Sequence, residues 1–218
     1  MINDIKLGLK VIRYGLNVKG CVIISVVFLL MGILMDFVVP AAPMNGLYIG
    51  MGTLILVQTI CSVSVSTMVQ TSSLKRRLQT SVPSVVGGLF LLLGNTVSIL
   101  VKFVGMKVFA WSSAEVANGI VITAVLIVII VLYMSGAMKV FWPATISFFI
   151  IYLLFFGFSS KMSFMTSEKP LLLSIEVSVV LSYVMIIAAT ALMYFIFVAT
   201  YKRNYSKQNF ETQLRRAK

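Results

Sequence analysis

The sequence predicts an all-α integral membrane protein with six transmembrane helices. Its mean hydropathy of +1.04, with 60% hydrophobic and only 11% charged residues, lies outside the range of soluble domains. The apolar residues gather in runs of about 20, the length that an α-helix needs to cross ~30 Å of hydrocarbon. The cations are concentrated in alternate connections between these runs, as the positive-inside rule requires of a membrane protein.

The first segment, residues 1–19, is predicted to form an amphipathic interfacial helix. Its apolar stripe with 3-4 spacing and the cations that border it are Ile2, Ile5, Leu9, Ile12, Leu16, Lys6, Lys10 and Arg13. A second apolar stripe on nearly the opposite face comprises Leu7, Val11, Tyr14 and Val18. Two stripes allow one face to contact lipid and the other to contact protein. The alternative is a basic segment that only orients the first span.

A transmembrane domain is predicted over residues 20–201. Its six spans are Gly20–Val39, Gly46–Met68, Val82–Met106, Val116–Met138, Val140–Phe158 and Leu171–Tyr201. An even number of spans places both termini on the same side of the membrane.

The distribution of cations predicts which side that is. Of the 18 Lys and Arg residues, fourteen lie in the N-terminal segment, the second-to-third and fourth-to-fifth connections and the tail. The four assigned to the opposite side are Lys102, Lys107, Lys161 and Lys169. We therefore expect a multi-pass protein of the cell membrane with cytoplasmic N- and C-termini.

The basic tail, residues 202–218, carries six cations and one acid. Next to a membrane anchor, this charge predicts binding to anionic lipid headgroups rather than to nucleic acid.

Composition argues against an enzyme. The chain has no histidine, which excludes histidine-ligated zinc or haem and Ser–His proteolysis. Cys21 and Cys61 alone cannot build a metal site. A Gly-x-x-x-x-Gly-Lys-Ser/Thr phosphate loop is also missing, so we expect no cofactor in this chain.

The connection between the second and third spans predicts a short helix. Thr71, Ser72 and Ser73 offer N-cap hydroxyls, and Pro83 opens the next span. Between them, the apolar pair and the adjacent cations are Leu74, Leu78, Lys75, Arg76 and Arg77. With Leu74 and Leu78 on one face, such a helix can dock into a groove of a cytoplasmic partner. The alternative is a positive-inside signal that needs only the charges.

The interfacial helix, the six spans and this basic helix before Val82-Pro83-Ser84 together resemble ABC-2 type permeases. In that family the interfacial "connecting" helix and the "coupling" helix after span two contact a separate ATPase subunit. The turn at Val82-Pro83 is similar to the family's Leu-Pro turn, with Val in place of Leu. The resemblance implies ATP and Mg in a partner chain, a second copy or a homologous permease, and small re-entrant helices within residues 159–176.

Four polar residues within the apolar segments are candidates for a transport pathway or for intramembrane polar contacts: Asp36, Gln58, Asn95 and Glu176. Asp36 lies near a span end, which favours solvation at headgroup level. Glu176 could be neutralised by Lys161 or Lys169, or could line a cavity. Amides in spans, such as Gln58 and Asn95, more often bond between helices.

The function expected from the resemblance is the permease subunit of an ATP-driven ABC exporter of apolar or amphipathic substrates, such as peptides or lipid-like compounds. One alternative is the six-span substrate-binding component of a vitamin importer, which the bulky first span disfavours because such components show small-residue faces there. Another is a non-transporting immunity or assembly protein of the membrane.

Overall fold

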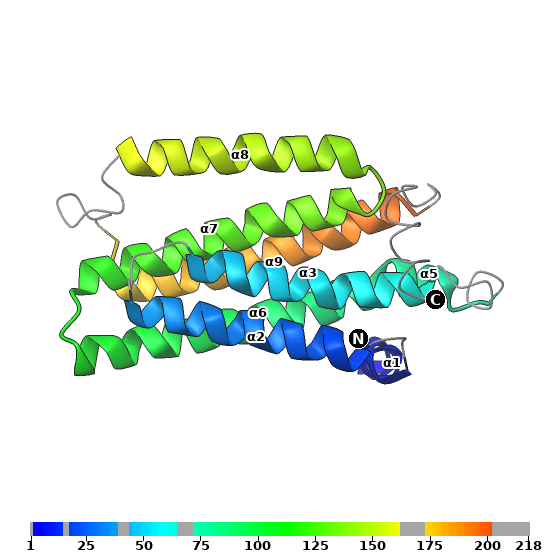
Figure 1. Ribbon diagram of the computed structural model, residues 1–218, viewed down its shortest axis with the longest axis horizontal. Helices are drawn as coiled ribbons and strands as arrows, with labels where there is room; N and C mark the ends of the chain where they lie inside the picture. The colour runs from blue at the N-terminus through cyan, green and yellow to red at the C-terminus, as the bar shows by residue number, and fades with distance from the viewer. Residues whose placement is uncertain (1, 15–17, 39–43, 65–71, 162–172, 202–218) are drawn as a thin grey trace.

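The computed structural model describes residues 2–14, 18–38, 44–64, 72–161 and 173–201. Every regular element in these ranges is an α-helix. The helices are α1 (Ile2–Tyr14), α2 (Val18–Val38), α3 (Met44–Ser64), α5 (Lys75–Gln79), α6 (Ser81–Val108), α7 (Ser113–Ala137), α8 (Phe141–Lys161) and α9 (Ile175–Ala199) (Figure 1).

Four helical stretches are long and apolar enough to cross a membrane: Gly20–Phe37, Ser81–Val108, Ser113–Ala137 and Ile175–Ala199. Two shorter apolar stretches, Asn45–Cys61 and Phe141–Leu154, belong to α3 and α8. The chain is therefore an all-helical protein with the character of a membrane protein. The six predicted apolar segments fall on α2, α3, α6, α7, α8 and α9.

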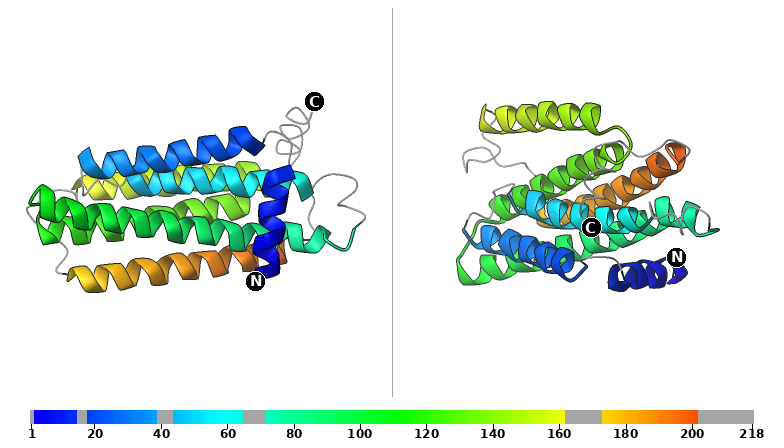
Figure 2. Two further views of the ribbon diagram at one scale, coloured as in Figure 1. Left: turned by 90° about the horizontal axis from the view of Figure 1, so that it is seen from below. Right: turned by 45° about the vertical axis from the view of Figure 1, so that its right-hand side comes forward.

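Five of the long helices, α2, α3, α6, α7 and α9, run side by side as a bundle, and α8 packs along α7 at its edge (Figure 1). The helix α1 lies across one end of this bundle (Figure 2). The largest buried cluster joins α3, α6, α7 and α9 through residues such as Val57, Leu91, Ile127 and Met193. On α2, by contrast, a row of large apolar side chains faces outward, including Ile23, Leu30 and Leu34.

The two ends of the bundle differ. At one end, here called the α5 end, lie α1, α5, the α7–α8 turn and the last residues of α9 (Figures 1 and 2). At the opposite end lie the last residues of α2, the α6–α7 turn and the start of α9. The helix α1 and the last residues of α9 therefore lie at the same end of the bundle.

Local sequence signals set the helix boundaries at the opposite end. Ser112 and Glu115 form a capping box at the start of α7, with the Glu115 amide donating to Ser112 Oγ at 3.2 Å. Ser174 caps α9 by accepting from the Val177 amide at 3.4 Å. The predicted re-entrant helices of residues 159–176 and the tail of residues 202–218 lie almost wholly outside the described residues.

Candidate functional site

The short helix α5 was predicted to present Leu74 and Leu78 together, and the structure corrects this. Leu78 is only 2% exposed, because it packs with Val11 of α1, Ile60 of α3 and Val82 of α6. Leu74 is 38% exposed and precedes the helix as its N-cap, with no side-chain cap bond. Leu74 therefore remains available to a partner, whereas Leu78 holds α5 to the bundle.

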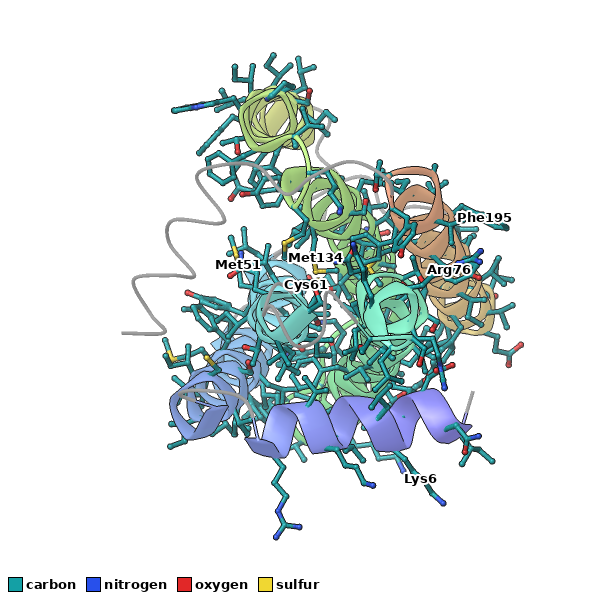
Figure 3. All side chains as sticks on the ribbon, turned by 90° about the vertical axis from the view of Figure 1, so that its right-hand side faces the viewer. Lys6, Met51, Cys61, Arg76, Met134 and Phe195 are labelled. Atoms are coloured by element: carbon teal, nitrogen blue, oxygen red, sulfur yellow. The ribbon has the colours of Figure 1, made fainter. Side chains whose placement is uncertain are left out.

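The three adjacent cations of α5 point toward three different neighbours. Arg77 donates from Nε and Nη2 to Oδ1 of Asp4 on α1, at 3.0 and 2.5 Å. Arg76 lines a recess at the end of α9, on the flank that also carries Phe195 (Figure 3). Lys75 lies near Lys139 of the α7–α8 turn. The cations of α5 thus lie close to α1, to the end of α9 and to the α7–α8 turn.

Burial at this junction changes the acid–base character of Lys139. Desolvation lowers the pKa of its ammonium group from the ordinary 10.5. The nearby Cys61 opposes this shift, and the positive charge of Lys75 adds to it. The α7–α8 turn and α5 therefore carry cations close enough to repel each other.

The helix α1 is held to α6 by close packing. A Cβ added to Gly8 would lie 2.4 Å from Val86 Cγ2, so only glycine fits at this crossing. Leu7 and Val11 pack into the same contact. The remaining interfacial-helix candidates point elsewhere: Leu9, Lys6, Lys10 and Arg13 are exposed and Ile5 is half-buried. Leu16 and the side chain of Ile12 lie outside the described residues.

A buried polar cluster lies toward the opposite end of the bundle. The Asp36 carboxylate of α2 pairs with the Lys102 ammonium group of α6, and both side chains are 0% exposed. Ser98 Oγ donates to Asp36 Oδ2 at 2.8 Å, and the Asn45 amide donates to Asp36 and to Ser98. One carboxylate thus joins α2, α3 and α6.

This cluster overturns two expectations. Asp36 is not solvated at headgroup level, because it faces into the bundle. Lys102 is not a loop cation of the opposite side, because it is buried on α6. Among the described side chains, Lys102 therefore does not count as a solvent-accessible cation of the opposite end.

Aromatic residues pack beside this cluster. Phe37 follows Asp36 and makes an edge contact with Phe109, with ring centroids 6.2 Å apart, and Phe109 stacks on Trp111 at 5.7 Å. Trp111 lies directly over Gly105, where a Cβ would meet its ring at 2.0 Å. The α6–α7 turn reaches this arrangement through Ala110, whose φ is +53°.

The other polar candidates have separate environments. Asn95 donates to Ser182 of α9 at 3.2 Å, as expected for an amide that bonds between helices. Gln58 is half-buried on α3. Glu176 is exposed in the first turn of α9, so it is not buried between helices. The side chains of Lys161 and Lys169, its expected partners, lie outside the described residues.

Sequence reasoning missed Asn45 and Ser98 and misassigned Lys102. A signal was present, since Asn95, Ser98 and Lys102 follow 3-4 spacing and therefore share one face of α6. Such a polar stripe on an apolar helix indicates contact with other helices rather than with lipid.

Within the ranges that the structure describes, no cluster of three or more His, Cys, Asp or Glu side chains could hold a metal ion. Comparison with known proteins finds no family model, no curated protein and no solved structure that matches this chain.

Proposed function

We propose that the chain is the six-span permease subunit of an ATP-driven exporter of the ABC-2 type, which works with a separate ATPase and a second permease copy or a homologous permease. The observation that carries this proposal is the junction at the α5 end. A crosswise amphipathic helix, α1, is bonded there to the short basic helix α5, and α5 leads into the long helix α6.

Helix lengths are compatible with six spans. The 21 residues of α3 and the 21 residues of α8 each extend about 32 Å at 1.5 Å per residue. That matches ~30 Å of hydrocarbon, so α3 and α8 would cross together with the four longer helices.

The α5 end is the cytoplasmic end in this proposal. It carries the exposed cations Lys6, Lys10, Arg13, Arg76 and Arg77. Such an excess of accessible Lys and Arg favours the cytoplasmic face. Both chain termini would then be cytoplasmic, in the cell membrane.

The ATPase would contact α5 around Leu74 and push on the junction. Because α5 is separated from α6 by Thr80 alone, and bonded to α1 through Asp4, a displacement would move α1 and α6 together. The Asp36–Lys102 pair would hold the opposite end closed until α6 moves away from α2. The long helices expose mainly apolar side chains. A pathway between such helices would suit an apolar or amphipathic substrate, such as a peptide or a lipid-like compound.

The test is purification of the chain from its native membrane in mild detergent, followed by mass spectrometry. We expect a phosphate-loop ATPase in stoichiometric amount, together with a second permease chain. The variant Leu74→Asp should lose the ATPase, since it places a charge at the exposed apolar residue of the junction.

The matched control is Val108→Asp, which introduces the same charge at a residue 66% exposed at the opposite end of α6. It should retain the ATPase. Purification of the chain without any ATPase, or equal ATPase retention by both variants, would contradict the proposal.

A further inference from the structure

A recess of about 310 Å³ lies between α5, with the Thr80 that follows it, and the end of α9. It is lined by Arg76 and Thr80 on one side, and by Val198, Ala199 and Tyr201 on the other. Its wall therefore combines one cation and two hydroxyl-bearing residues with aliphatic surface. A ligand that fits this wall carries a negative group next to an apolar part.

Among the residues that the structure describes, the charge of Arg76 has no ion-pair partner. Of the acids in the described ranges, Asp4 pairs with Arg77. Asp36 is held by Lys102, and Glu115 and Glu176 belong to the first turns of helices that start at the opposite end. A positive charge without a nearby carboxylate attracts an anion from outside the protein.

Tyr201 makes the recess more suitable for an anion. Its side chain is half-buried at the point where the apolar sequence of α9 ends, the level at which tyrosines meet the headgroup region of a bilayer. The hydroxyl of Thr80 already donates to the Arg76 carbonyl at 2.7 Å, so Arg76 and the Tyr201 phenol are the side-chain donors left for a ligand.

The surface that continues from the recess along α9 is apolar. Leu192, Tyr194 and Phe195 are 40 to 65% exposed there, and Figure 3 places Phe195 on the same flank as Arg76. A ligand anchored at Arg76 would therefore find a hydrocarbon-compatible face along α9, toward the bilayer interior.

We propose that this recess binds the phosphate group of an anionic membrane phospholipid, with Arg76 as its cationic contact, Tyr201 as a hydrogen-bond donor and the acyl chains along the outer face of α9. The site lies on α5 and α9 at once, so the lipid would join the two elements. It does not depend on an ATPase partner.

A purely structural role of Arg76 makes a different prediction. The last turn of α9 exposes backbone carbonyls, and a cation near a helix C-terminus is stabilising by itself. In that case loss of Arg76 would lower the stability of the protein without changing its affinity for lipid.

The experiment is native mass spectrometry of the full chain in detergent, titrated with phosphatidylglycerol and, in parallel, with phosphatidylcholine. Arg76→Gln should weaken the tightest phosphatidylglycerol binding about fivefold, the effect of losing one cation that contacts an anionic headgroup directly. Ala199→Phe, which fills the recess and leaves the charge unchanged, should weaken it as well. Lys10→Gln removes an exposed cation at the same end and should change it less than twofold.

Other outcomes overturn the proposal. Equal losses for Arg76→Gln and Lys10→Gln would indicate general electrostatic attraction rather than a site. Competition by millimolar inorganic phosphate would indicate a small-anion site without a role for the acyl chains. If Arg76→Gln released a co-purifying ATPase and left phosphatidylglycerol binding unchanged, Arg76 would belong to a protein contact. Thermal unfolding of each variant verifies that it is folded, and Arg76→Lys should restore most of the binding.

Discussion

The Asp36–Lys102 pair offers the sharpest test of the packing at the opposite end of the bundle. Both side chains are 0% exposed, and the carboxylate also accepts from Ser98 and Asn45. The variant Asp36→Asn removes the negative charge and leaves the Lys102 ammonium buried without a counter-charge. Breaking a buried pair in this way costs about 3–5 kcal/mol of unfolding free energy.

The double variant Asp36→Asn/Lys102→Met removes both charges and leaves side chains of similar size. Replacing a whole buried pair in this manner is often close to neutral. We therefore expect the double variant to be more stable than Asp36→Asn alone, with a coupling energy of about 2 kcal/mol or more. The single and double variants would be compared by unfolding with SDS in mixed micelles.

The exposed pair at the α5 end provides the control. Arg77 is 45% exposed and Asp4 14%, so Asp4→Asn should cost no more than about 1 kcal/mol. If Asp36→Asn proved no more destabilising than Asp4→Asn, or if the double variant cost the sum of its single variants, the buried pair would not hold α2 to α6 as argued.

Two further predictions concern backbone positions. Gly46→Ala places a Cβ 2.6 Å from the backbone oxygen of Thr123, which cannot move aside as a side chain can, so this variant should lower stability in detergent by about 1–3 kcal/mol. The control Gly20→Ala, where a Cβ would have nothing within 4 Å, should be neutral or stabilising. Equal effects of the two variants on thermal unfolding would contradict the close α3–α7 contact. Ala110 has a φ of +53°, which glycine adopts without the strain of a Cβ. Ala110→Gly should therefore raise stability by up to about 1 kcal/mol, measured by the same thermal unfolding in detergent. A loss of stability would mean that the α6–α7 turn is not strained.

The positions of the long helices were predictable from the sequence because they depend on local composition. Each apolar segment of about 20 residues became a helix with boundaries only a few residues away. That α3 and α8 also cross the membrane stays a prediction, because the length and hydropathy of the described residues identify only the other four long helices as candidate spans. Local composition thus predicts where a helix lies in the sequence better than it predicts whether that helix crosses the membrane.

The polar partners were less predictable because they depend on distant residues. Asp36 and Lys102 are 66 positions apart, and no spacing within either helix reveals that they meet. Leu78 illustrates a related difficulty. Its i, i+4 spacing from Leu74 predicted that both side chains would be presented to a partner, but Leu78 is buried and Leu74 is exposed. Periodicity does not distinguish a side chain that packs on α1 from one that a partner would cover.

The helix α6 connects the two ends of the bundle mechanically. About two turns from its start it is wedged between two neighbours, since a Cβ on Gly87 would lie 2.9 Å from Val57 of α3 and one on Gly88 would lie 2.4 Å from Thr190 of α9. From Gly88 the helix extends about 10 Å to its start at Ser81 and about 21 Å to Lys102 at 1.5 Å per residue. A rigid tilt about this glycine pair would therefore move Lys102 about twice as far as Ser81.

That ratio matters for the ion pair. A shift of about 2 Å at the start of α6 would become about 4 Å at Lys102, which exceeds the separation over which an ammonium group and a carboxylate stay hydrogen-bonded. Separating the two charges in an apolar interior is costly unless water enters. The end of the bundle that holds Asp36 and Lys102 would therefore resist small displacements. It would open only when α6 tilts far enough for water to reach the pair. The glycine pair and the buried ion pair together would convert a push at α5 into a threshold response at the other end, which is the behaviour that an ATP-driven export cycle needs.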